Sequence, residues 1–516
     1  MCLLFFPNLV CMEHLTVLLA EPGAAPLDPA FAAALDERLG ASRRAHFLLP
    51  TRAPAPPPAA SAAAGAAPPS AAPPPLVYLC GNSLGLQPAR CAGYVGEELV
   101  KWGAMGVEGH FTAPRPWVST DEGAAPGLAA LVGAASPSEV VAMGTLTSNL
   151  HHLLCAFYRP AGARNRILLE AGAFPSDAHA AASQAALHGL DPRATLLHPA
   201  STRTEDVCAA IAAAGDTLAL VLLPGVQYYS GHLLDIRAVT AAAHAAGAVA
   251  GWDLAHAIGN APLALHDWGV DFAVWCSYKY LNSGPGGMAG AFVHARHGAG
   301  GAGARFRLAG WWGHRAEDRF VMATEHIAAP GAQGYALSNP CVLAMAALRA
   351  SLDEFAAAGG LPALRERSLA LTGYLEAALL ASGLFARGGG GAGGEILTPA
   401  DPSARGAQLS LEVRQGAGAP TLDDLCACLR EEGVVVDERR VRAGKRRWGL
   451  QRARHSAALP HPRTFKHTHI STPLVQPSVI RVAPAPLYNT AADVLYFVQA
   501  LARAYERCRA EGRVYK

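Results

Sequence analysis

One lysine of this sequence stands next to tyrosines at the end of an apolar segment. Lys279 directly follows FAVWCSY (residues 272–278), and it is one of only five lysines in 516 residues. An amine beside an apolar strand loses hydration, so it must be paired, neutralised or used covalently. Asp253 follows a second apolar run, GAVAGW, 26 positions before the lysine. That separation is one crossover connection, so both groups can face the same crevice at the carboxyl ends of parallel strands.

An acid and an amine in one strand-end crevice indicate pyridoxal phosphate. This cofactor needs a lysine for its Schiff base and a carboxylate that keeps the ring nitrogen protonated. Thr147, together with Thr145 and Ser148, directly precedes an apolar helical run, and a helix N-terminus with hydroxyl groups suits a phosphate. Phe174 offers a flat surface to the ring, and Asp177 is a polar contact close by.

Each of these residues has a simpler interpretation when it is taken alone. Thr147 can be a helix N-cap, Phe174 a core residue, and Asp253 the cap of a following helix. Lys279 is the hardest of them to explain by packing. The cofactor site is therefore predicted by the combination of these residues at this spacing.

The segments around these residues predict a parallel sheet that is covered on both faces. Between residues 141 and 293, short strands that are apolar throughout alternate with helical runs such as SDAHAAASQAALHG (residues 176–189). This alternation is typical of a doubly covered parallel sheet. From residue 339 a long helical pattern precedes the strands QLSLEV and VIRVAP, which indicates a smaller α+β domain. The expected fold class is α/β, with a mostly parallel sheet in the large domain.

Composition shifts divide the chain into four expected stretches. Residues 1–26 are expected to be a poorly structured N-terminus. Residues 27–104 form the N-terminal segment of the small domain and contain a Pro/Ala linker at 52–75. Residues 105–345 form the large cofactor-binding domain, and residues 346–516 complete the small domain.

A basic insert at about residues 439–479 interrupts the small domain. It contains ten lysines or arginines and no acidic residue. It can be a solvated surface insertion, which costs little free energy. It can also be an unspliced segment of the gene, or a nuclear-localisation or nucleic-acid patch centred on GKRRWGLQRAR.

The bulk composition argues against nucleic acids and membranes as partners. Charged residues make up 16% of the chain and the net charge is +2, so no strong field attracts a polyanion or an anionic surface. The 11 cysteines are scattered, no CxxC pair occurs, and Cys426 and Cys428 are too close together for a zinc site. We therefore expect no metal, reduced thiols and a cytoplasmic protein.

Several long motifs resemble those of kynureninase, a fold-type-I pyridoxal-phosphate enzyme. Among them are YLCGNSLGLQP (residues 78–88), LLEAGAFPSDAHA (168–180) and the run from Asp253 to Phe292. The resemblance extends over about residues 27–506 and implies the fold-type-I architecture. It also implies hydrolysis of L-kynurenine or 3-hydroxy-L-kynurenine to anthranilate or 3-hydroxyanthranilate and L-alanine.

The resemblance also implies roles for individual residues. Lys279 would hold the cofactor and move the Cα proton, Asp253 would pair with the ring nitrogen, and Tyr278 would assist at the phosphate. Arg481 would bind the substrate carboxylate, a task that suits the two-pronged guanidinium. The implied cofactor-binding residues are Leu146, Thr147, Phe174, Pro175, Ser176, Asp177, Pro224, Asp253, His256, Tyr278, Lys279, Trp311 and Asn339. The implied substrate-binding residues are Ser83, His110, Asn339 and Arg481.

In the family, the positions of Trp311 and Asn339 reach the site of the neighbouring subunit, so the resemblance implies a homodimer with shared active sites. A histidine and an asparagine at the positions of His110 and Asn339 go with a preference for the 3-hydroxylated substrate.

Two departures from the family pattern bear on activity. Pro224 stands where family members can carry a serine that contacts the cofactor. The basic insert directly precedes Arg481 and can displace it. The alternatives are a related class V enzyme, namely a cysteine desulfurase or an aminotransferase, or an inactive scaffold protein. A desulfurase needs a cysteine on a mobile loop, and we expect the nearest one, Cys341, to lie in the core.

Overall fold

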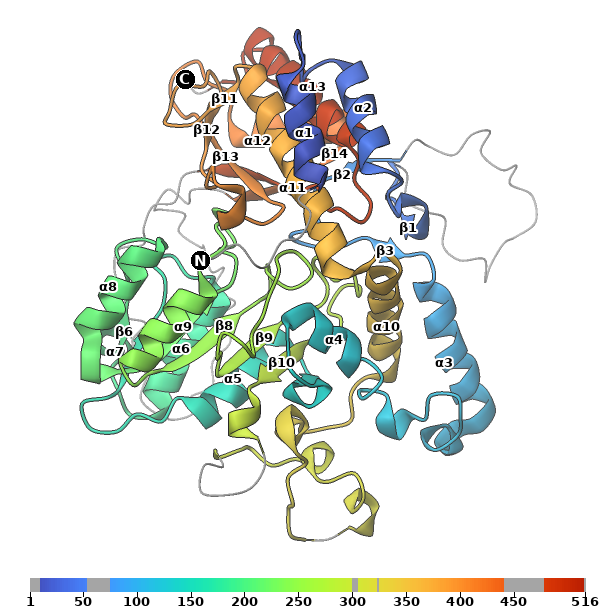
Figure 1. Ribbon diagram of the computed structural model, residues 1–516, viewed down its shortest axis with the longest axis vertical. Helices are drawn as coiled ribbons and strands as arrows, with labels where there is room; N and C mark the ends of the chain where they lie inside the picture. Colours follow the sequence, from blue (N-terminus) through green and yellow to red (C-terminus); the bar gives the residue numbers. More distant parts are fainter. Residues whose placement is uncertain (1–9, 53–74, 299–304, 323, 440–477, 515–516) are drawn as a thin grey trace, which may run out of the picture.

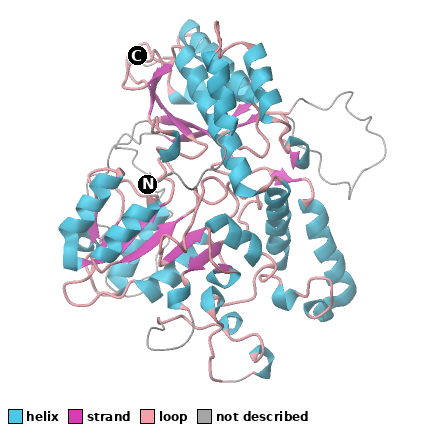
Figure 2. Cartoon of the chain, in the orientation of Figure 1, coloured by secondary structure: helices cyan, strands magenta, loops and turns pink. Residues whose placement is uncertain are grey.

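The computed structural model describes residues 10–52, 75–298, 305–322, 324–439 and 478–514, and it consists of a large and a small domain (Figure 1). Each domain is built on one sheet with helices packed against it, as the cartoon in Figure 2 shows.

The large domain contains a seven-stranded sheet in the order β4-β10-β9-β8-β7-β5-β6. Strands β5 to β9 run parallel to one another, and β10 is antiparallel to its two neighbours, β9 and β4. The strands are β4 (Val140–Ala142), β5 (Arg166–Leu168), β6 (Leu196–Leu197), β7 (Leu218–Pro224), β8 (Val249–Asp253), β9 (Phe272–Trp275) and β10 (Gly290–Val293). The expected mostly parallel sheet is confirmed.

The strands are apolar throughout because both faces of this sheet are buried. Along β7, Leu220 and Leu222 point into one hydrophobic cluster, whereas Val221 and Leu223 point into another. The first cluster includes residues of α5 (Leu146–Phe157) and α6 (Pro175–Leu187). The second includes residues of α4 (Ala125–Val132), α8 (Thr204–Ala214) and α9 (Ile236–Ala245), so helices cover both faces. The short helix α7 (Pro192–Thr195) leads into β6.

The small domain contains a five-stranded sheet in the order β11-β12-β13-β16-β15. Its strands are β11 (Phe385–Ala386), β12 (Gly394–Ile396), β13 (Leu409–Val413), β15 (Asp437–Arg439) and β16 (Val479–Val482). Its helices are α1 (Val10–Ala20), α2 (Pro29–Leu39), α11 (Gly360–Ala381), α12 (Leu422–Glu431) and α13 (Ala491–Ala510). Two further strand pairs join distant segments, β1 (Phe47–Leu48) with β3 (Gln87–Pro88), and β2 (Val77–Tyr78) with β14 (Val434–Val435).

The N-terminus differs from the expectation. Helix α1 packs beside α11 and buries Leu15 and Leu18 in the core of the small domain. The prediction of a poorly structured segment is therefore wrong for residues 10–20. The reason is that Leu15 and Leu18, three positions apart on one face of the helix, are buried against α11. This packing stabilises the helix and cannot be seen in the sequence of α1 alone.

Two helices connect the domains. Helix α10 (Val342–Ala357) packs along α3 (Cys91–Met105), and both lie beside the large domain in Figure 1. The expected boundary between residues 345 and 346 falls inside α10, and the chain turns toward the small domain at Ala358 and Gly359, before α11 begins.

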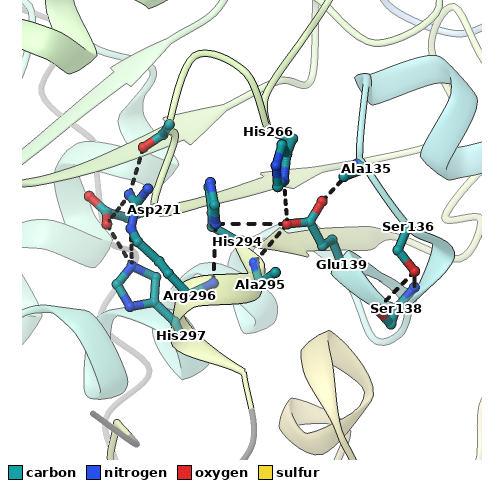
Figure 3. A network of polar contacts seen from close by, with 11 residues as sticks. Ala135, Ser136, Ser138, Glu139, His266, Asp271, His294, Ala295, Arg296 and His297 are labelled. Carbon is teal, nitrogen blue, oxygen red and sulfur yellow. Dashed lines mark hydrogen bonds and ion pairs between the residues drawn. The ribbon is translucent and has the colours of Figure 1, made fainter.

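A buried carboxylate joins three segments at one edge of the large sheet (Figure 3). Glu139 accepts hydrogen bonds from the backbone amides of Ala135 (2.8 Å) and Ala295 (2.7 Å) and from Nδ1 of His266 (2.9 Å). His294 stacks on His266, and the ligand atoms of these three side chains lie within 4.8 Å of one another. Burial alone would raise the pKa of Glu139, but the hydrogen bonds outweigh it and the pKa is lowered. Because these donors satisfy the carboxylate, we interpret the cluster as a structural link and not as a metal centre.

The basic insert and the Pro/Ala linker each begin and end at neighbouring points of the fold. Arg439 pairs with Val479 across the antiparallel strands β15 and β16, so the ends of the basic insert meet in a hairpin. Thr51 likewise forms a bridge with Pro75 at the ends of the Pro/Ala linker. Residues 53–74 and 440–477 themselves, with the GKRRWGLQRAR motif, lie outside the described residues.

We expect that replacing residues 440–477 with Asn-Gly, so that Asn, Gly and Ser478 form a three-residue connection between the paired residues Arg439 and Val479, leaves the fold intact. The register of β15 and β16 is set by residues on either side of the insert, and a shorter connection costs less closure entropy. The free energy of unfolding of the full chain and of the shortened chain, measured in urea, should be equal or should rise by about 1–3 kcal/mol on shortening. A fall of that size would show that the insert contributes to the native structure.

Candidate active site

One hollow at the carboxyl ends of β7 and β8 collects most of the residues that the sequence singled out. Its lining includes ten of the predicted cofactor residues: Leu146, Thr147, Phe174, Ser176, Asp177, Pro224, Asp253, His256, Tyr278 and Lys279. Pro224 and Asp253 are the last residues of their strands and lie directly opposite each other in the register. Pro175 is the first residue of α6, between two lining residues.

Lys279 points at the other functional groups of this hollow. Its Nζ lies 3.0 Å from Nε2 of His256 and 5.9 Å from the centres of the Phe174 and Tyr278 rings. The lysine is not at the strand end itself, because β9 ends at Trp275 and the chain turns through Ser277 before reaching it. This turn moves the amine away from the sheet and into the crevice.

Two buried carboxyl groups share a hydrogen bond in the hollow. Asp253 accepts from the amide of Ala255 (2.7 Å) and contacts the side chain of Asp177. Burial raises the pKa of Asp177 well above its usual value, and the neighbouring Asp253 raises it further. Burial also raises the pKa of Asp253, but Lys279 and the hydrogen bonds oppose that rise. Within the pair, the strongly raised pKa of Asp177 favours the proton on that side chain, and Lys279 favours the negative charge on Asp253.

Asp253 does not cap a helix, because residues 255–260 form turns. Phe174 is not a core residue either, because its side chain is 41% exposed. Both simpler interpretations of these residues are therefore wrong.

His256 is a neutral base beside the lysine. Burial lowers its pKa well below the usual value, and the positive charge of Lys279 lowers it further. Its Nδ1 is buried and has no hydrogen-bond partner among the described residues, and the same holds for Oδ1 of Asp177. Buried polar atoms without partners are costly, so both point to a polar ligand in this hollow.

Two helices begin at the opposite side of the hollow. Thr145 and Ser148 form the capping box of α5, so Thr147 is not the cap of this helix. The hydroxyl group of Thr147 lies 2.7 Å from the hydroxyl group of Ser176, which is in the first turn of α6. Backbone amides at two helix starts and two hydroxyl groups together suit a phosphate.

Arg481, on β16 of the small domain, does not line the hollow itself but contacts a residue that does. It is 1% exposed and donates from Nη1 to the carbonyl oxygen of Tyr228 (2.6 Å), a residue of the large domain that lines the hollow. Tyr228 in turn contacts Phe174 edge to face, with 5.3 Å between the ring centres. The pKa of Arg481 falls to about 10, mainly because of burial, so the guanidinium remains charged.

Besides Pro175 and Arg481, four predicted residues do not line the hollow of a single chain. Trp311 is 46% exposed and donates from Nε1 to the carbonyl of Arg319, and Asn339 is exposed. His110 lies edge-on to Trp117 at the end of a 3-10 helix, and Ser83 is in the turn that follows Cys80.

The expectation that Cys341 lies in the core is wrong. It is exposed at the N-cap of α10, because the apolar pattern of this segment becomes helical only from Val342.

Some residues of the hollow escaped the sequence analysis. Glu170 and Tyr228 line it. Gly85 donates its amide to the carbonyl of Tyr278 (2.8 Å), and a side chain there would collide with the Lys279 carbonyl oxygen. The glycine itself was one signal available in the sequence. Glu170 directly follows the apolar run ILL, two positions after the end of β5, so its place near a strand end was a second signal.

Solved structures of low sequence identity share this fold. One is a C-DES mutant with glycine covalently linked to its PLP cofactor, at a TM-score of 0.63 and 15% identity, covering 83% of this chain and 96% of that chain. Another is the cysteine desulfurase CsdA from Escherichia coli, at a TM-score of 0.61 and 18% identity, covering 84% and 95%. A family model for class-V aminotransferases matches residues 117–387. The fold and the hollow are thus those of a fold-type-I pyridoxal-phosphate enzyme.

More similar relatives narrow the class. A kynureninase C-terminal domain model matches residues 364–445. The kynureninase of Eremothecium gossypii is 48% identical over 85% of this chain and 92% of that protein. The kynureninase of Salinispora tropica is 46% identical over 83% and 90%. The chain therefore belongs to the kynureninase family.

The residues of the hollow fit pyridoxal phosphate. Lys279 offers the amine, Asp253 the carboxylate for the ring nitrogen, Phe174 the aromatic surface, and the starts of α5 and α6 the phosphate cradle. The unpartnered atoms of Asp177 and His256 supply further polar contacts. Pro224 offers no hydroxyl where a serine can occur, but Ser176 and Thr147 provide two.

The raised pKa of Asp177 predicts different consequences for two similar substitutions. Asp177→Asn preserves a neutral hydrogen-bonding group, so the affinity for pyridoxal phosphate should stay within about threefold. Asp253→Asn removes the charge that faces the ring nitrogen and should weaken binding by about 10- to 100-fold. Absorbance titration of the two apo variants with the cofactor measures both affinities, and the reverse order would place the proton on Asp253.

Proposed function

We propose that this chain hydrolyses the Cβ–Cγ bond of L-kynurenine or 3-hydroxy-L-kynurenine and releases L-alanine with anthranilate or 3-hydroxyanthranilate. The reaction belongs to tryptophan catabolism and the synthesis of NAD. The observation that carries the proposal is the joint presence of Lys279, Asp253, His256 and the two helix starts in one hollow of a kynureninase-family chain.

Bound pyridoxal phosphate supplies an electron sink for the bonds broken around the substrate Cα. The residues of this chain supply charge, position and proton transfer. The ionised carboxylate of Asp253 stabilises positive charge at the ring nitrogen, and Phe174 and the helix starts fix the orientation of the ring and the phosphate. Lys279 Nζ lies in the hollow and moves the proton at the substrate Cα. His256 next to it is neutral, so it places no second positive charge beside the lysine.

Arg481 binds the substrate carboxylate from the small domain. Its guanidinium already reaches across to Tyr228 in the large domain, so a carboxylate bound there bridges the two domains. Binding of the substrate then favours the closed arrangement of the domains around the reacting atoms.

Exposed aromatic residues support a homodimer with shared active sites. Phe320 packs edge-on against both Phe111 and Trp311, with ring centres 5.4 Å apart in each pair. These three side chains are 46–59% exposed, and we call them the aromatic patch. An exposed apolar cluster marks an interaction surface. A second copy of the chain on this patch brings Trp311 and Asn339 toward the site of its partner.

The protein acts in the cytoplasm. The cysteines that the structure describes form no disulfide, as expected in a reducing compartment. None of the described helices is long and apolar enough to cross a bilayer.

Incubation of the holoenzyme with each kynurenine tests the proposed reaction. We expect release of L-alanine and the matching anthranilate, with 3-hydroxykynurenine preferred. Arg481→Gln should raise KM by about 100-fold, because a charge-assisted bidentate contact is lost. Release of alanine from cysteine with transfer of sulfur would favour a desulfurase that uses exposed Cys341, and exchange of an amino group with a keto acid would favour an aminotransferase. A cofactor-loaded protein with none of these activities would favour the scaffold.

The aromatic patch predicts the oligomeric state. The wild-type chain should show a mass near twice 53.5 kDa by light scattering. Phe320→Asp places a charge in the patch and should shift the protein toward single chains and reduce its activity. Leu187→Asp, at a side chain on α6 that is 70% exposed and outside the patch, is the matched control and should change neither property. A Phe320→Asp variant that keeps the doubled mass and full activity would contradict the shared site.

A further inference from the structure

Arg481, which we assign to the substrate carboxylate, already forms an ion pair with a carboxylate of the protein itself. Asp437 on β15 lies directly opposite Arg481 in the antiparallel register with β16. Its Oδ2 forms an ion pair with Nη2 of Arg481, and both side chains are largely buried, at 10% and 1% exposure. A buried ion pair of this kind fixes the guanidinium far more firmly than an exposed one.

This pair lies entirely within the small domain. The two residues occupy facing positions on neighbouring strands, so their separation is set by the sheet and not by the position of the large domain. The contact between Arg481 Nη1 and the Tyr228 carbonyl, in contrast, crosses between the domains. Asp437 is thus a permanent partner of Arg481, and Tyr228 is the contact that domain movement can change.

The other oxygen of Asp437 is occupied as well. Its Oδ1 accepts from Nη1 of Arg439 at 2.7 Å, so one carboxylate is shared by two arginines. The three groups carry a net charge of +1, which remains available for an anion. The Nε atom of Arg481 is buried and has no hydrogen-bond partner among the described residues. A donor of this kind, next to an Nη group that is already oriented, suits one oxygen of an incoming carboxylate.

We infer that Asp437 is a positioning residue that orients the Arg481 guanidinium for the carboxylate of the substrate. The inference rests on the proposed function of Arg481. Asp437 does not touch the substrate, and it raises affinity by holding the arginine in its binding geometry before the substrate arrives. The opposite role, a competitor that occupies the arginine, predicts tighter binding when Asp437 is neutralised.

Asp437→Asn in the holoenzyme separates these roles. We expect KM for L-kynurenine to rise about 10-fold while kcat stays within about twofold, because the lost orientation affects binding and not the reacting atoms. The dissociation constant of L-alanine, measured by the absorbance change of the bound cofactor, should rise by the same factor. Glu438→Gln, the neighbouring residue on the same strand, removes the same charge without touching Arg481 and should leave both constants unchanged.

A double-mutant cycle shows whether Asp437 acts through Arg481. In an Arg481→Gln background, Asp437→Asn should cause no further loss of L-alanine affinity. Full additivity of the two effects would overturn the inference, as would an unchanged or lower KM in Asp437→Asn. Asp437→Glu keeps the charge and should bind L-alanine better than Asp437→Asn, and it serves in the cycle if the asparagine variant does not fold.

The same data separate the inference from the proposed function. A wild-type enzyme that cleaves no kynurenine refutes the proposed reaction, yet the L-alanine cycle still tests Asp437. Unchanged L-alanine affinity in Arg481→Gln refutes the assigned role of Arg481 and the inference with it.

Discussion

Burial of like charges is the constraint on which this site depends. Asp177, Asp253 and Glu170 all lie in the hollow, and Lys279 is the amine that faces them. Burial raises the pKa of Glu170 to about 8, and that of Asp177 rises well above its usual value. Burial therefore favours the protonated forms of both groups, whereas Lys279 favours the negative charge on Asp253. A hollow with this balance favours a ligand that brings its own positive charge to Asp253 and a negative charge to the helix starts on the other side.

The backbone around the hollow delivers these groups from four separate segments. Asp253 ends a parallel strand, Lys279 lies in the turn after the next strand, and Thr147 and Ser176 lie in the first turns of two helices. Carboxyl ends of strands and N-termini of helices meet at the same edge of a parallel sheet, so the topology itself gathers acids, amines and anion-binding amides there. Gly85 shows how tight the assembly is, since the segment that contains it passes against the Lys279 backbone without room for a side chain.

The fold tolerates two long interruptions, the basic insert and the Pro/Ala linker, because the ends of each lie next to each other. The basic insert and the Pro/Ala linker each begin and end at residues that pair with each other, Arg439 with Val479 and Thr51 with Pro75. Closing a long connection between fixed neighbours costs little more than closing a short one. Arg481, two residues beyond Val479, keeps its register opposite Asp437, so the insert does not displace it.

What the sequence could predict follows from the range of the interactions involved. The parallel sheet and the positions of Asp253, Lys279 and Thr147 were predictable because strand apolarity, helix starts and strand ends are local features. The pairing of Asp437 with Arg481 was not, because 44 positions and an insert separate them in the chain and only the strand register brings them together. Helix α1 was not predicted for the same reason, because its apolar side chains are buried only by packing against α11, which is distant in the sequence. The arginine that we assign to the substrate carboxylate was thus suggested by a motif, whereas the carboxylate that we infer to orient it required the three-dimensional structure.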